Sequence, residues 1–183
     1  MLWGCTTVPQ QLNKVEDWSV YSASLQQLTT FNAAGKLGYI SHKNRVSLNF
    51  HWKQNSQGYV LRLSTFLGGN ILQLTVNAQG AFLVDDKGKT HYGHSAEDLI
   101  YQLTGLVVPV DQIKDWIKGL PTGADNYQLD AFHRVQTLNK DQQWTARYSR
   151  YQNTDKMVLP KDILLQQMNN KTKIKIMINT WEL

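Results

Sequence analysis

The segment 46-VSLNFHWKQNSQGYVLRLSTFLGGNILQLTVN-77 decides the fold, because apolar and polar residues alternate along it in three separate runs. In the first run, residues 46–53, every second side chain is apolar, which is the period of a β-strand with one buried face. Asn55-Ser56-Gln57-Gly58 then supplies the residues of a tight turn. Similar turns follow at 77–80 and 85–88. We therefore predict a meander of antiparallel strands.

Apolar residues also occupy the tip of the hairpin predicted between the second and third runs. Phe66 and Leu67 stand directly before Gly68, Gly69 and Asn70, which are the residues that a tight turn requires. The two side chains either fold back onto the core or remain exposed. An exposed apolar tip suits a protein that touches a membrane or a partner.

Length and composition indicate a single folded domain. The 183 residues are 42% hydrophobic and 18% charged, which allows a substantial core and does not indicate disorder. The net charge of +5 favours anionic surfaces such as lipid headgroups. Lys171, Lys173 and Lys175 make one face of a late strand basic, which is typical of a solvated face or a protected sheet edge. The lysines are otherwise scattered and no base-stacking motif accompanies them, so we expect no nucleic-acid partner.

One helix is predicted before the first strand, and two more interrupt the strands within residues 95–121. Trp18, Tyr21, Leu25 and Leu28 are spaced as one face of an amphipathic helix over residues 17–30. A second helix is predicted to start at a capping box formed by Ser95 and Asp98 and to end at Gly105. A third begins near Asp111 and stops at Gly119 and Pro121. The fold class is thus mainly β, with a curved antiparallel sheet covered by a few short helices.

More than ten large apolar side chains fall on the inner face of this sheet, and the short helices must cover them. With complete cover they form a filled core. With loose cover the same side chains line an apolar cavity. Periodicity does not distinguish the two arrangements.

The residues that could support catalysis or bind a metal do not form a complete motif. His91 and His94 have the spacing of a metal-ligand pair, but no cluster of further ligands completes the site. Gly93-His94-Ser95 begins like a nucleophile elbow, yet Glu97 stands where that motif requires glycine. We predict no enzyme activity, no metal and no cofactor. A small-ligand hydrolase using His91, His94 and Ser95 is the alternative from another class.

The beginning of the chain carries a modification signal. Leu2-Trp3-Gly4-Cys5 resembles the cleavage box of bacterial lipoproteins, in which the cysteine becomes lipidated. The polar stretch that follows it is typical of an extended tether. We therefore divide the chain into a lipidation box and tether at 1–16 and one folded domain at 17–183. No run of about 20 apolar residues predicts a transmembrane helix.

The middle of the chain carries a pattern that resembles the LolB family of outer-membrane lipoprotein receptors. Its elements are Leu103-Thr104-Gly105, Val108-Pro109-Val110 and 116-WIKGLP-121. The resemblance extends to Gly38-Tyr39-Ile40-Ser41, to the Leu67-Gly68 tip, to the turn at 84–88 and to the closing 178-INTW-181.

This resemblance implies a half-open β-barrel with a helical lid and an apolar cavity for acyl chains. It further implies a monomeric, lipid-anchored protein that faces the periplasm. Such a protein accepts lipoproteins from the carrier LolA and releases them into the inner leaflet of the outer membrane. Cys5 would carry the anchor, and the loop Phe66, Leu67, Gly68 and Gly69 would deliver cargo to the membrane. A purely structural surface lipoprotein with a filled core remains the other alternative. The predicted cavity lining is Leu48, Phe50, Trp52, Leu61, Leu63, Leu72, Leu74, Leu103, Ile113, Trp116, Ile117, Trp144, Tyr148 and Ile178.

Overall fold

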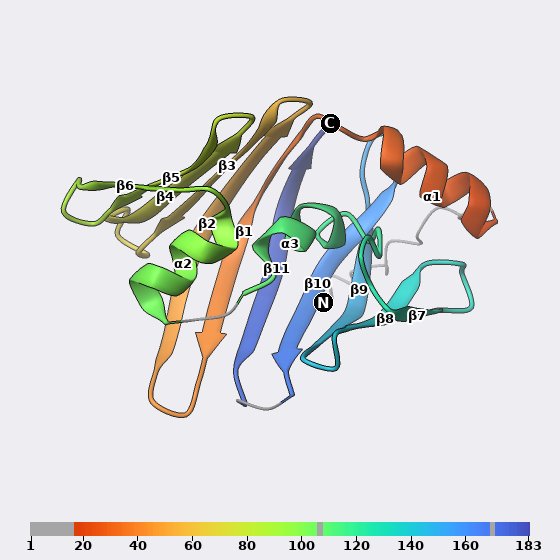
Figure 1. Ribbon diagram of the computed structural model, residues 1–183. Coiled ribbons are helices and arrows are strands. Elements are labelled where there is room, and N and C mark those ends of the chain that lie inside the picture. The colour runs from red at the N-terminus through yellow and green to blue at the C-terminus, as the bar shows by residue number, and fades with distance from the viewer. Residues whose placement is uncertain (1–16, 106–107, 169–170) are drawn as a thin grey trace, which may run out of the picture.

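The computed structural model describes residues 17–105, 108–168 and 171–183, and these form one antiparallel sheet of eleven strands with helices on one side of it (Figure 1). The strands are β1 (Phe31–Ile40), β2 (Arg45–Asn55), β3 (Gly58–Ser64), β4 (Asn70–Asn77), β5 (Gly80–Asp85), β6 (Thr90–Gly93), β7 (Asn126–Leu129), β8 (Val135–Lys140), β9 (Trp144–Asn153), β10 (Val158–Gln167) and β11 (Lys173–Glu182).

The order of the strands is β6-β5-β4-β3-β2-β1-β11-β10-β9-β8-β7. Strands β1 to β6 form one meander and strands β7 to β10 form another, and within each meander every strand pairs with its neighbours in sequence. The last strand, β11, lies between β1 and β10 and joins the two meanders. Because β6 and β7 form the two edges and do not pair with each other, the sheet described here is not closed into a barrel. The curved, half-open architecture predicted from the sequence is confirmed.

Local chemistry explains the tight turns and the bend of the sheet. The side-chain oxygen of Asn55 accepts hydrogen bonds from the backbone N–H groups of Gln57 and Gly58 at 2.9 and 3.1 Å, which closes the β2–β3 turn. A β-bulge in β11 lies opposite the step from Ala34 to Gly35 in β1, because Ala34 pairs with Thr180 and Gly35 with Ile178. A Cβ atom at Gly35 would lie 1.9 Å from the carbonyl oxygen of Met177, so only glycine fits at this bulge. Bulges of this kind bend a strand and increase its twist.

The three helices are α1 (Trp18–Gln27), α2 (Ala96–Thr104) and α3 (Val110–Trp116), and all lie over the same face of the sheet (Figure 1). The predicted caps of α2 are confirmed. The Ser95 hydroxyl accepts a hydrogen bond from the backbone N–H of Asp98 at 3.1 Å, and Gly105 ends the helix with a φ of 70°.

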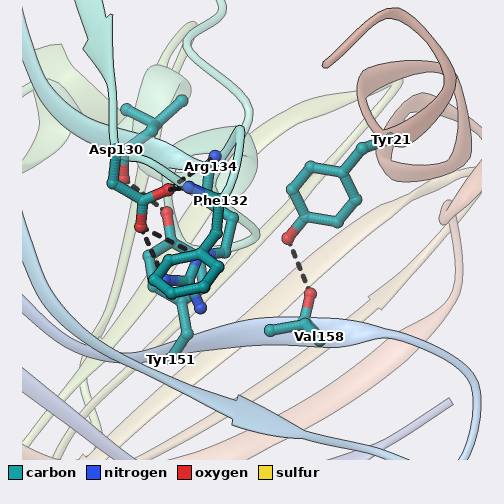
Figure 2. A network of polar contacts seen from close by, with 7 residues as sticks. Tyr21, Asp130, Phe132, Arg134, Tyr151 and Val158 are labelled. Atoms are coloured by element: carbon teal, nitrogen blue, oxygen red, sulfur yellow. Dashed lines mark hydrogen bonds and ion pairs between the residues drawn. The ribbon is translucent and has the colours of Figure 1, made fainter. Parts of the chain in front are cut away.

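Buried hydrogen bonds attach α1 to the β7–β10 part of the sheet. The Tyr21 hydroxyl donates to the carbonyl oxygen of Val158 at 2.6 Å (Figure 2). Beside it, Asp130 and Arg134 form an ion pair at 2.6 Å. The Arg134 guanidinium also lies over the rings of Phe132 and Tyr151, 4.8 and 4.6 Å from their centroids. The Tyr21 hydrogen bond therefore ties α1 to β10, and the Arg134 contacts order the segment beside it.

Lys118 connects α1 to the turn after α3. Its side chain is buried, and its ammonium donates to the carbonyl oxygens of Leu25 and Leu28 at 3.0 Å each. The Asp115 carboxylate lies 3.4 Å away. Burial lowers the pKa of Lys118, and the three oxygen partners compensate part of that unfavourable desolvation. Lys118 thereby satisfies carbonyl groups that the end of α1 leaves unpaired.

We expect Lys118→Met to reduce the free energy of unfolding by about 2–3 kcal/mol, because it leaves two buried carbonyl oxygens without a donor. Urea unfolding followed by circular dichroism measures this change. Lys114→Met, on the exposed side of α3, is the matched control and is expected to change stability by less than about 0.5 kcal/mol. Equal effects of the two substitutions would contradict the proposed link.

Candidate functional site

A cavity of about 330 Å³ lies between the inner face of the sheet and helices α2 and α3. All of its lining residues are apolar or aromatic, and they come from β1 to β5, β11 and the α2–α3 region. The lining consists of Leu37, Tyr39, Val46, Leu48, Phe50, Trp52, Leu61, Leu63, Ile71, Leu72, Leu83, Ile100, Val108, Val110, Ile113, Ile117, Ile174 and Ile176.

Eight of the residues predicted as cavity lining lie on this cavity: Leu48, Phe50, Trp52, Leu61, Leu63, Leu72, Ile113 and Ile117. The structure places the other six elsewhere. Leu103 is 41% exposed, as its neighbours Tyr101 and Gln102 in α2 are exposed too. The remaining five are packed into the filled part of the core: Leu74, Trp116, Trp144, Tyr148 and Ile178.

The filled part of the core has specific polar contacts as well as apolar packing. The Trp116 indole donates to the carbonyl oxygen of Thr122 at 2.9 Å, and the Tyr148 hydroxyl donates to the carbonyl oxygen of Trp116 at 2.8 Å. These bonds hold the end of α3 against β9. The sequence predicted the inward direction of these side chains but not which half of the sheet the helices cover tightly.

Several lining residues were missing from the sequence prediction. Leu37 and Tyr39 alternate with glycine and lysine in β1, so period two marks this strand too. Ile174 and Ile176 alternate with the lysines of β11, and their inward direction follows from the basic outer face. The β1 and β11 strands meet only in the folded sheet, so no local pattern joins these four residues into one wall.

The walls of the cavity are only partly covered. Leu48, Leu61 and Leu63 lie under the helices yet remain half-buried, and Val46 at one end of the cavity is 42% exposed. Full burial of such a side chain stabilises a protein by about 1.5–3 kcal/mol, so these partly buried side chains contribute only part of that stabilisation. The helices therefore cover this half of the sheet loosely.

The hairpin tip between β3 and β4 exposes its two apolar side chains. The Thr65 backbone N–H donates to the carbonyl oxygen of Gly69 at 2.8 Å, and the Thr65 hydroxyl accepts from the N–H of Gly69 at 3.0 Å. Gly68 takes a φ of 87°, which favours glycine. This closed turn leaves Phe66 83% exposed and Leu67 92% exposed. They do not fold back onto the core.

Two carboxylates meet where the start of α2 approaches the start of α3. The Glu97 side chain accepts a hydrogen bond from the backbone N–H of Asp111. Burial, together with the charge of Asp111, raises the pKa of Glu97 above its usual value, and burial likewise raises the pKa of Asp111. Like charges held together at neutral pH weaken the contact between the two helices.

The residues considered for a hydrolase or a metal site serve structural contacts instead. His91 pairs with the Asp85 carboxylate at 2.9 Å, whereas the Ser95 hydroxyl caps α2. His94 is exposed. Within the described residues no group of three or more His, Cys, Asp or Glu side chains is placed to hold a metal ion.

Comparison with known proteins decides the family. The family model described as "Outer membrane lipoprotein LolB" matches residues 29–181. The outer-membrane lipoprotein LolB of Vibrio vulnificus is 40% identical over 185 residues, covering 98% of this chain and 91% of that protein. The chain belongs to the LolB family. The LolB protein of Vibrio cholerae is also 40% identical, covering all of this chain and 91% of its own length.

The fold agrees with this membership. A LolA superfamily protein from Nitrosomonas europaea superposes with a TM-score of 0.59 at 7% identity, covering 88% of this chain and 93% of that one. The chain is thus an outer-membrane lipoprotein of the LolB family, with a role in lipoprotein localisation, and this family is not one of enzymes. None of the helices in the described ranges is long and apolar enough to cross a membrane. Cys5 lies outside the described residues.

We expect Glu97→Gln to raise the melting temperature at pH 7 by about 2 °C, because it removes one of two close charges and retains an acceptor for the Asp111 N–H. The folded chain holds the Glu97 proton more tightly than the unfolded chain does. The free energy of unfolding of the parent therefore falls as pH rises from about 4.5 through the raised pKa. The variant lacks this decrease.

Thermal melts between pH 4 and pH 8 test this expectation. Asp86→Asn removes an exposed carboxylate from the turn between β5 and β6, away from both groups, and serves as the control. It is not expected to raise the melting temperature. A parent and a Glu97→Gln variant with parallel pH profiles would disprove the charge conflict.

Proposed function

We propose that this protein accepts lipoproteins from a LolA-type periplasmic carrier, shields their acyl chains in the cavity and inserts them into the inner leaflet of the outer membrane. The observation that carries the proposal is the wholly apolar cavity with half-buried walls. Apolar walls bind alkyl chains without directional bonds and so accept many different cargoes. A purely structural protein would have no use for such a surface.

Transfer of acyl chains through water requires a shield. Each exposed methylene contributes about 0.8 kcal/mol to the unfavourable transfer, and a triacylated lipoprotein carries dozens of them. No nucleotide is needed if each recipient binds the cargo more tightly than the previous one, since roughly 1.4 kcal/mol biases the transfer tenfold.

The cavity must enlarge to hold a complete cargo. Its volume of about 330 Å³ is at the lower end of the roughly 300–1,000 Å³ typical of sites for drug-sized ligands. Three long acyl chains exceed such a ligand in size. We propose that α2 and the start of α3 move outward, because the end of α3 and α1 are held by Lys118, Trp116 and Tyr148.

The cavity and the exposed tip lie close together on the same strands. Leu63 and Ile71 line the cavity and stand only three to five residues from Phe66 and Leu67. An acyl chain that leaves the cavity between Leu63 and Ile71 emerges beside the tip. Burial of both tip side chains in a membrane contributes at most about 3–6 kcal/mol, which suits reversible contact. Lipidated at Cys5, one copy of the chain would stay anchored near its target surface.

A charge placed on the cavity wall is expected to reduce acyl-chain binding. Leu48→Glu introduces a carboxylate beneath the lid and should weaken binding of a fluorescent fatty acid by roughly tenfold or more. Ser47→Glu, one position away on the opposite face of β2, is the matched control and should bind like the parent. Fluorescence titration measures both. Equal affinity in the two variants, or no binding by the parent, would refute the cavity's role.

A charge on the tip is expected to block delivery without affecting cargo binding. Leu67→Glu should lower lipoprotein transfer to liposomes by roughly tenfold or more, because the side chain can no longer enter the membrane. Val20→Glu changes another exposed apolar side chain, on α1, and should transfer cargo normally. A reconstituted transfer assay separates the two. Normal transfer by Leu67→Glu would exclude the tip from delivery.

A further inference from the structure

The outer face of the sheet, opposite the helices, is basic across β11, β1, β2 and β3. Lys175, Lys36, His51, Lys53 and Arg62 are exposed on it, because their neighbours along each strand point inward to the core. Two acidic side chains also lie on this face, and an ion pair neutralises one of them. Asp162 forms an ion pair with Arg150, and Glu182 accepts a hydrogen bond from the Asn32 amide at 2.9 Å.

Two hollows on this face share part of their lining. The first, of about 540 Å³, includes His51, Lys53 and Arg62 among its lining. The second, of about 340 Å³, shares His51 and Arg62 with the first and extends to Gly68 in the hairpin tip. His51 and Arg62 are direct partners across β2 and β3. We call the two hollows together the basic groove.

The basic groove carries unneutralised charge. No acidic side chain lines either hollow. Among the described residues, neither Lys53 nor Arg62 forms an ion pair, and the Arg62 guanidinium donates only to the amide oxygen of Gln73, at 2.8 Å. Two flexible cations without counter-charges attract an anionic group.

An exposed aromatic pair lies on the same face, two strands away. Phe82 and Tyr92 are cross-strand partners with an edge-to-face contact at 5.4 Å, and Tyr92 is 70% exposed. Tyrosine side chains are enriched where proteins meet the headgroup layer of a membrane. The basic groove thus lies between an apolar tip and aromatic side chains. This combination favours a lipid bilayer, rather than a soluble anion, as the binding partner of the groove.

We propose that the basic groove binds the phosphate groups of anionic phospholipids and tilts this face of the sheet toward the membrane when the tip enters it. Arg62 stands two residues before the end of β3, roughly 7 Å along the strand. The headgroup layer is about 5–7 Å thick. With Phe66 and Leu67 in the acyl region and the end of β3 at its boundary, Arg62 lies at the level of the phosphates, and tilting brings Lys53 to them as well.

Binding to vesicles tests this proposal, which rests on the proposed delivery function. The full chain with Cys5→Ala is floated with vesicles of phosphatidylglycerol and phosphatidylethanolamine, or with vesicles of phosphatidylcholine alone. We expect stronger binding to the anionic vesicles. Lys53→Gln combined with Arg62→Gln should weaken that binding about tenfold or more, because each cation near an anionic surface contributes roughly fivefold.

The matched control combines Lys114→Gln on α3 with Lys156→Gln between β9 and β10, which removes the same net charge elsewhere. It should bind within about twofold of the parent. Binding of fluorescent fatty acid is measured on every variant, so a parent without acyl binding would overturn the delivery function separately from the groove.

Three results would overturn the groove's assignment to a membrane. The groove variant could bind anionic vesicles as the parent does. Inorganic phosphate alone could displace the parent, which would assign the groove to a soluble anion. The groove variant could keep vesicle binding and lose only the acceptance of cargo from its carrier, which would assign the groove to an acidic protein surface.

Discussion

The apolar inner face of one wide, open sheet is larger than three short helices can cover, and the rest of the structure depends on this mismatch. A sheet with one apolar face must bury it against another layer. Here α1 and the end of α3 seal the part next to β8–β10, where Val135, Leu138 and Leu159 are fully buried. Over β1–β4 the cover is incomplete. The leucines there line the cavity and are only partly covered by α2 and α3.

This division separates a tightly packed half of the molecule from a loosely covered half. Side-chain hydrogen bonds to carbonyl groups concentrate in the tightly packed half, at Tyr21, Lys118 and Tyr148. At the junction of α2 and α3, by contrast, the carboxylates of Glu97 and Asp111 repel each other. Local opening follows the regions with the least burial and the fewest satisfied contacts.

Sequence alone predicted the elements whose signals are local. The alternation in β2, β3 and β4, the Asn55 turn and the Ser95 and Gly105 caps each rest on neighbouring residues, and each is confirmed. Strand β10 lacks such a local signal, because the run Val158-Leu159-Pro160 does not alternate and Pro160 precedes an irregularity in the pairing with β9. The insertion of β11 between β1 and β10 depends on contacts remote in sequence, which no local pattern encodes.

The same limit explains which cavity residues sequence could indicate. Period two gives the direction of a side chain but not the thickness of the layer above it. Phe50 and Tyr148 both point inward, yet one meets the cavity and the other meets α3. The exposed tip differs, because its closed turn leaves Phe66 and Leu67 no route back to the core. Since β3 and β4 carry both this tip and one cavity wall, any tilt of the hairpin at a membrane also moves the cavity's edge toward the lipid.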